Sequence, residues 1–231
     1  MAEADWERLI TNALDELLVS AGTTTIGTPP DGTKCIGYHM IQSGQGFAGH
    51  ICALTSYTPV TGDKGGSITA CMRKFGPGDH SPVIFFADGK DVASARGYIL
   101  GLSGEEPSRI VLKKGNLSSP LLSTGDDVLA VSDADFPTNP WIQLSLFVTV
   151  NAHGEVGLAV RRIDPVDVTP PIGLGVEEPG IATLVDDNGG IISGSVPLAG
   201  PFYVGHGCYF GGSQGRKALF DYTIIGRQTA P

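Results

Sequence analysis

Apolar and polar residues alternate along most of the chain, as in strands that bury one face. The clearest run is Trp141 to Val150, in which every second residue from Ile142 is aliphatic. Alternation resumes at Val156 after the turn signal Asn151-Ala-His-Gly154, so residues 141–161 predict a β-hairpin with one core face. An isolated hairpin cannot bury its apolar face, so it needs further strands to pack against. Other segments of the chain alternate in the same way and can supply these strands. We therefore expect an all-β, antiparallel sandwich.

One N-terminal segment follows a different period. Between Asp5 and Val19 the apolar residues recur at three- and four-residue spacings, which is typical of an amphipathic α-helix. Asp5 can cap the start of this helix, and Ala21-Gly22 follow its end. We expect residues 1–22 to form a helical arm and residues 23–231 to form the sandwich. The large apolar side chains of the predicted arm are Trp6, Leu9, Ile10, Leu14, Leu17 and Leu18.

The apolar face of the predicted arm needs a partner surface, because an isolated helix of this length is marginal in water. One interpretation is that the arm covers an end of its own sandwich. The other is that it docks on a neighbouring subunit. We favour docking, because assembly needs an adhesive element and this is the most apolar periodic segment of the chain.

Composition narrows the function classes. The 231 residues include 33 Gly and 16 Pro, which favours short elements joined by turns, and a hydrophobic content of 41% excludes a disordered chain. A net charge of −9 argues against nucleic-acid binding. The longest apolar stretch, Trp141 to Val150, is about half a membrane span, so no membrane partner is expected. The acidic start Met1-Ala-Glu-Ala-Asp5 predicts no signal peptide.

Several segments together resemble one fold family. They are Gly66–Arg73, Pro82–Phe86, Gly97–Leu102, Arg109–Gly115, the hairpin Trp141–Val160, and the closing pair Phe202–Gly205 and Ala218–Ile225. In this order residues 66–228 resemble a concanavalin/laminin-G-like jelly roll. That family includes lectins, glycosidase domains, adhesion modules and virion proteins, so the resemblance implies a fold but no single function.

The chain as a whole is similar to structural proteins of tailed-phage particles, being a glycine-rich jelly roll with a short arm. This resemblance implies a non-enzymatic tail or baseplate protein of the virion, which assembles with other virion proteins or with copies of itself. The alternative is a lectin-like, carbohydrate-binding module for receptor recognition. Its candidate aromatic platforms for a glycan are Trp141, Tyr203 and Tyr209.

Motifs for catalysis or cofactor binding do not fit their usual context. Gly44-Gln-Gly-Phe-Ala-Gly49 has the spacing of a dinucleotide loop, but a predicted strand follows it where a helix is needed. Glu105-Glu106 is one of several carboxylate pairs, and none has the Glu-x-Asp-x-Glu pattern of jelly-roll glycosidases. We expect no catalytic residues and no cofactor.

The glycine-rich segment Asp186-Asp-Asn-Gly-Gly190 is the candidate metal loop. Its oxygen-bearing side chains suit calcium, which takes six to eight oxygen ligands. Asp, Asn and Gly are also the usual residues of a hairpin turn. We expect a turn and no bound metal, with Asp186, Asp187 and Asn188 as the calcium candidates.

Overall fold

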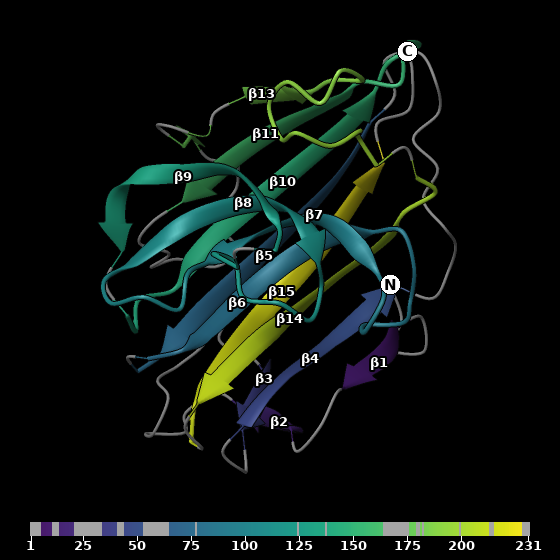
Figure 1. The fold of residues 1–231 in the computed structure, drawn as a ribbon. Helices are drawn as coiled ribbons and strands as arrows, with labels where there is room; N and C mark the ends of the chain where they lie inside the picture. Colours follow the sequence, from purple (N-terminus) through teal and green to yellow (C-terminus); the bar gives the residue numbers. More distant parts are fainter. Residues whose placement is uncertain are drawn as a thin grey trace.

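Two antiparallel sheets face each other in the computed structural model, which describes residues 6–10, 14–20, 34–40, 44–52, 65–76, 78–123, 125–136, 138–163, 176–178, 181, 183–198, 200–212 and 215–227 (Figure 1). The strands of the front sheet are β1 (Trp6–Ile10), β4 (Gly44–Cys52), β6 (His80–Ala87), β7 (Arg96–Leu102), β8 (Ser108–Asn116), β9 (Asp127–Phe136) and β14 (Tyr203–Gly212). The strands of the back sheet are β2 (Leu14–Ser20), β3 (Lys34–Met40), β5 (Gly65–Phe75), β10 (Ile142–Val150), β11 (Val156–Ile163), β12 (Val176–Glu177), β13 (Thr183–Asp186) and β15 (Lys217–Arg227). Within these residues the front sheet has the order β1-β4-β14-β6-β7-β8-β9. The back sheet has the order β12-β11-β10-β5-β15-β3-β2, with β13 paired to β11.

The predicted hairpin at residues 141–161 is confirmed as β10 and β11. These strands pair from Gln143↔Ile163 to Val150↔Val156. The turn is held by Asn151, whose Oδ1 accepts the backbone N–H groups of His153 and Glu155. Gly154 has a φ of 77°, a backbone conformation that favours glycine. The aliphatic face of both strands is buried in the core between the sheets, as the alternation predicts.

The predicted N-terminal helix is wrong. The apolar residues expected to form one contact face lie in two different sheets. Trp6, Leu9 and Ile10 lie on β1 in the front sheet, whereas Leu14, Leu17 and Leu18 lie on β2 in the back sheet. β1 pairs with β4, and β2 pairs with β3. The two partner strands offer unpaired backbone groups at the ends of their sheets, and this pairing outweighs a local helix that is marginal at this length. The predicted docking on a neighbouring subunit concerns side chains outside the described residues.

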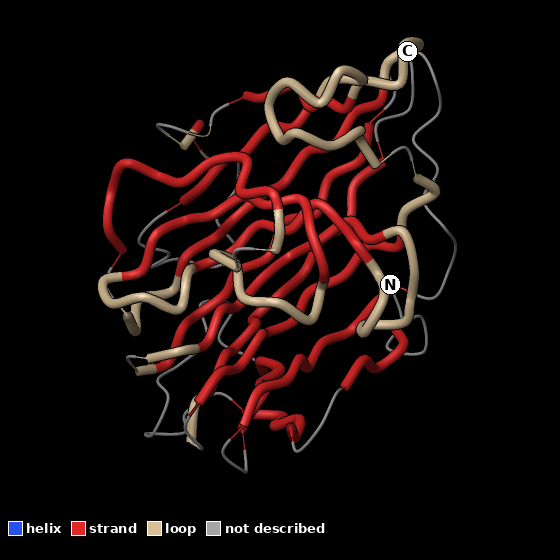
Figure 2. Tube along the Cα trace, in the orientation of Figure 1, coloured by secondary structure: helices blue, strands red, loops and turns tan. Residues whose placement is uncertain are grey.

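The described part of the chain consists of strands and loops (Figure 2). No helix within it has the length and apolar character that crossing a membrane requires.

A second apolar cluster covers the outer face of the front sheet. Phe47 and Phe85 lie at its centre with edge-on rings, and Tyr209 belongs to the same cluster. Val92 and Leu121 join it from the loops that follow β6 and β8. These loops therefore pack over the outer face of the front sheet and form raised walls on that face.

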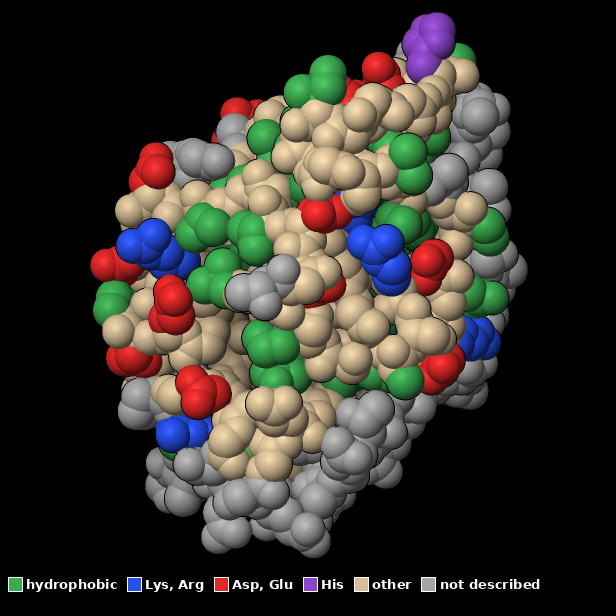
Figure 3. All heavy atoms as spheres, viewed as in Figure 1, with side chains coloured by type: hydrophobic (Ala, Val, Ile, Leu, Met, Phe, Trp, Pro, Cys, Tyr) green, Lys and Arg blue, Asp and Glu red, His purple; other side chains and the backbone are tan. Residues whose placement is uncertain are grey.

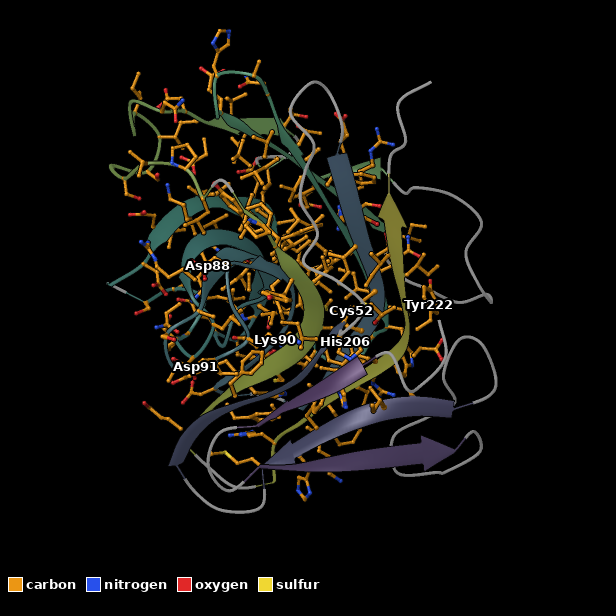
Figure 4. All side chains as sticks on the ribbon, turned by 90° about the vertical axis from the view of Figure 1, so that its right-hand side faces the viewer. Cys52, Asp88, Lys90, Asp91, His206 and Tyr222 are labelled. Atoms are coloured by element: carbon orange, nitrogen blue, oxygen red, sulfur yellow. The ribbon has the colours of Figure 1, made fainter. Side chains whose placement is uncertain are left out.

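Two buried histidines face the core from the front sheet. His206 on β14 stacks on Phe220 with ring centroids 4.6 Å apart, and its Nδ1 lies 2.5 Å from Thr223 Oγ1. Figure 4 labels His206 together with Cys52, which lies on the paired strand β4. His80 on β6 stacks on Phe210. Burial lowers the pKa of each ring to about 3, so both are neutral in the folded protein near pH 7.

Candidate functional site

A cavity of ≈ 360 Å³ opens on the outer face of the front sheet, where β14 lies between β4 and β6. One side is formed by strand residues and the other by the loops that follow β7 and β8. The lining residues are Gln45, Asp79, Ser81, Gly104, Glu105, Pro120, Leu121, Leu122, Tyr209, Gly211 and Gly212. Figure 3 views the molecule from this side and shows acidic side chains spread among apolar ones.

Strand register brings the floor of the cavity together. Tyr209 on β14 pairs with Ser81 on β6, and Gly211 pairs with Gln45 on β4. A Cβ atom added to Gly211 would lie 3.4 Å from Cβ of Asp79 and 3.5 Å from Cε1 of Tyr209. The missing side chain of Gly211 therefore leaves open the space between the phenol ring and the carboxylate.

Two hydroxyl groups on the floor have no hydrogen-bond partner in the part of the chain that the structure describes. Ser81 is 1% exposed and Tyr209 is 6% exposed, so both residues are buried. Among the described residues, neither side-chain hydroxyl forms a hydrogen bond, and neither oxygen is sealed from the cavity. Buried polar groups in proteins are nearly always hydrogen-bonded to protein or water. These hydroxyls are therefore available to a ligand that brings its own donors and acceptors.

The cavity is acidic. Asp79 and Glu105 line it, and the lining includes no Lys, Arg or His among the described residues. Burial raises the pKa of Tyr209, and the nearby Asp79 carboxylate raises it further. The phenol is consequently protonated near neutral pH and can donate a hydrogen bond into the cavity.

A buried lysine fixes the wall that carries Gly104 and Glu105. The Nζ of Lys74 on β5 donates hydrogen bonds to the carbonyl oxygens of Ser103 (2.9 Å) and Glu105 (3.1 Å), and to Ser108 Oγ (2.9 Å). Burial lowers the pKa of Lys74, and nearby acids, with Glu106 first, oppose that effect. The ammonium thus ties the β7–β8 loop to the back sheet.

A second buried lysine fixes the opposite wall. Lys113 on β8 donates from Nζ to the carbonyl oxygens of Asn116, Ser119 and Pro120, to Ser119 Oγ, and to Asp126 Oδ2 at 2.7 Å. Burial alone raises the pKa of Asp126, but hydrogen bonds from Lys113 and Ser119 outweigh it and hold the pKa below its ordinary value. The loop that carries Pro120 and Leu121 is therefore set in place before any ligand arrives.

The three calcium candidates point to separate partners. Asp186 pairs with the buried Nζ of Lys114 at 2.8 Å and accepts a hydrogen bond from the Tyr98 hydroxyl. Asp187 Oδ1 accepts the N–H of Ile191, and Asn188 Nδ2 donates to the carbonyl oxygen of His153. The Lys114 ammonium therefore already lies beside Asp186, in the place where this carboxylate would stabilise a metal cation. Among the described residues, no group of three or more His, Cys, Asp or Glu side chains is placed to hold a metal ion.

The three predicted glycan platforms occupy different environments. Tyr209 lines the cavity. Tyr203 packs beside the outer cluster of the front sheet, with Lys90 Nζ 5.3 Å from its ring centroid; Figure 4 labels this lysine. Trp141 belongs to a cluster on the back sheet, is 8% exposed and has the Arg73 guanidinium 6.0 Å from its ring centroid.

Sequence reasoning missed most of the cavity. Gln45, Asp79 and Ser81 were not candidates, and Glu105 appeared only as part of a carboxylate pair. One signal was present in the sequence, since Ser81 stands directly before the apolar run Pro82–Ala87 of β6, a strand that is buried along its whole length. A hydroxyl at a buried strand position needs a partner, and this requirement marks it as a site candidate.

Solved structures share this two-sheet fold. The endo-β-1,4-glucuronan lyase from the fungus Trichoderma reesei has a TM-score of 0.54 at 11% identity, covering 94% of this chain and 90% of that chain. The Emp46p carbohydrate recognition domain in its potassium-bound form has a TM-score of 0.52 at 10% identity, covering 96% of this chain and 88% of that chain. At such identities the likeness shows the fold alone, a jelly-roll sandwich of the lectin-like kind.

The sequence matches no protein-family model and no curated protein. Nothing in the comparisons links the chain to tailed-phage virion proteins, so the tail or baseplate role stays a prediction.

Proposed function

We propose that the protein is a carbohydrate-binding module and that its ligand occupies the cavity on the front sheet. The observation that carries this proposal is the pair of hydroxyls of the buried residues Ser81 and Tyr209, which open into the cavity and have no partner among the described residues. Sugar hydroxyls both donate and accept hydrogen bonds and can satisfy both groups at once. The ring of Tyr209 adds an apolar surface for the C–H face of a pyranose.

The size and rigidity of the site support a small-molecule ligand. A cavity of ≈ 360 Å³ lies at the lower end of the range of about 300–1,000 Å³ that is usual for ligand sites. Lys74 and Lys113 hold the two walls, so little ordering is left to occur on binding. The fold neighbours add support, since one is a carbohydrate recognition domain and another is an endo-β-1,4-glucuronan lyase.

The lining favours binding over catalysis. A glycosidase needs a carboxylic acid with a raised pKa beside a second carboxylate, and Asp79 and Glu105 are both exposed side chains at the rim. Uronate elimination needs a base and a cation beside the uronate carboxylate. The pKa of Tyr209 is raised, which makes the phenol a poor base, and the described lining brings no cation. We therefore propose a non-catalytic role.

A glycan array compared between the wild type and Gly211→Leu tests the proposal. The leucine side chain would enter the space between Tyr209 and Asp79, so we expect the wild type to bind one glycan class and the variant to lose that binding. Tyr209→Phe removes only the hydroxyl and should weaken affinity about three- to tenfold, the value of one neutral hydrogen bond.

Gly189→Leu is the matched control, because Gly189 lies in an exposed turn after β13, apart from both walls, and does not line the cavity. This variant should bind as the wild type does, and both leucine variants should melt cooperatively. Equal binding by Gly211→Leu and the wild type would refute the cavity as the site. An array with no bound glycan of any class would refute the function.

A further inference from the structure

We infer that the cavity selects saccharides that carry protonated amino groups over neutral and uronate saccharides, an inference that rests on the proposed function. The two ionisable side chains that meet the cavity from its rim are the carboxylates Asp79 and Glu105. They lie on separate segments, at the start of β6 and in the β7–β8 loop, so a bound sugar meets negative charge from two directions.

Neither carboxylate is neutralised by an ion pair within the described residues. Lys74 keeps its charge and attracts Asp79 through space, but its Nζ is hydrogen-bonded to carbonyl oxygens and to Ser108, while Lys113 pairs with Asp126. The Arg216 guanidinium lies against Gly78, which is outside the lining. The charged groups that face the cavity itself are therefore the two carboxylates, which attract an ammonium group and repel a carboxylate.

The floor supplies a second, independent indication of a ligand. Ser81 and Tyr209 are more than nine-tenths buried, and their hydroxyls open into the cavity without a partner in the described chain. They can fix the sugar ring through its hydroxyls, while the rim carboxylates meet a substituent of that ring. An amino sugar satisfies both requirements in one molecule, since it carries hydroxyls and a cation together.

Calorimetric titration with three tetrasaccharides tests this selectivity. The ligands are the glucosamine tetramer, its N-acetylated form and the glucuronic acid tetramer, each measured at low and moderate salt at a mildly acidic pH at which the glucosamine amines are protonated. We expect the glucosamine tetramer to bind about tenfold more tightly than the N-acetylated form at low salt, with the difference shrinking as salt screens the charges. The glucuronic acid tetramer should bind most weakly.

Asp79→Asn and Glu105→Gln remove each charge while keeping the shape of the side chain. The double variant should abolish the preference for the amine, so that the amino and N-acetylated tetramers bind with similar affinity. Asp133→Asn is the matched control, because Asp133 is an exposed acid on β9 that does not line the cavity. It should change the preference little, although it alters the net charge equally.

The outcomes separate this inference from the proposed function. Equal binding of the acetylated and amino tetramers would overturn the selectivity and leave carbohydrate binding intact. Binding of an oligolysine peptide with no saccharide bound on the array or in the titrations would overturn both. A preference for the amine that survives in the double variant would move its source away from Asp79 and Glu105.

Discussion

Lys113→Met is expected to lower the free energy of unfolding by about 3–5 kcal/mol, the usual cost of removing one partner from a buried ion pair. Asp126 would keep its charge without the ammonium at 2.7 Å, and three loop carbonyl oxygens would lose their donor. The wall that carries Pro120 would then lose its support, so saccharide binding should weaken at temperatures at which the variant is still folded. Urea unfolding and ligand titration measure the two effects.

Lys114→Met is the control for the binding effect. Its ammonium is equally buried and pairs with Asp186 and, at 4.0 Å, with Asp127; neither these acids nor its other partners, Ser193, Ser195 and Val196, line the cavity. Stability should fall by a similar amount while affinity is kept. Loss of affinity in both variants would show that global destabilisation, and not the position of the wall, controls binding.

Acid is expected to destabilise the protein by about 4 kcal/mol between pH 7.5 and 5, since each of two histidines contributes about 2 kcal/mol. Burial lowers the pKa of His80 and of His206 to about 3, whereas an unfolded histidine titrates at about 6.5. The unfolded chain therefore binds more protons in this range. Their stability contribution is complete above about pH 6.5 and is lost as the pH falls toward 3.

The free energy of unfolding in urea at the two pH values measures this loss. His80→Gln and His206→Gln should each reduce the difference between the two pH values by about half, whatever their effect at pH 7.5. His153→Gln changes an exposed residue of the β10–β11 turn and should leave the difference as it is. An unchanged pH dependence in both core variants would contradict the assignment of the neutral histidines.

The alternation of apolar and polar residues made the sandwich predictable. The periodicity of the N-terminal segment, in contrast, predicted a helix where the structure has two strands. In β10, five aliphatic residues on one face leave a single interpretation, and the structure confirms it. The segment from Trp6 to Leu18 fits a helical period locally, but its pairing partners are residues 34–40 and 44–52. A periodicity within one segment carries no information about a free strand edge elsewhere in the chain.

The cavity was less predictable because its residues come from five separate segments. Tyr209 was a candidate for its aromatic ring, but only the register of β14 places it beside Ser81, 128 positions earlier in the numbering (209 − 81). The walls depend on Lys74 and Lys113, and from the sequence alone both would be predicted to be ordinary solvent-exposed charges. Their burial follows from tertiary packing, and no local sequence pattern predicts it.

The structure of the complex with the tightest-binding saccharide tests the central claim most directly. We expect a sugar ring in the cavity against Tyr209, with sugar hydroxyls hydrogen-bonded to the hydroxyls of Ser81 and Tyr209 and with the walls at residues 103–108 and 116–123 unmoved. A saccharide bound elsewhere, for example on the back sheet beside Trp141, with the cavity holding only water, would contradict it.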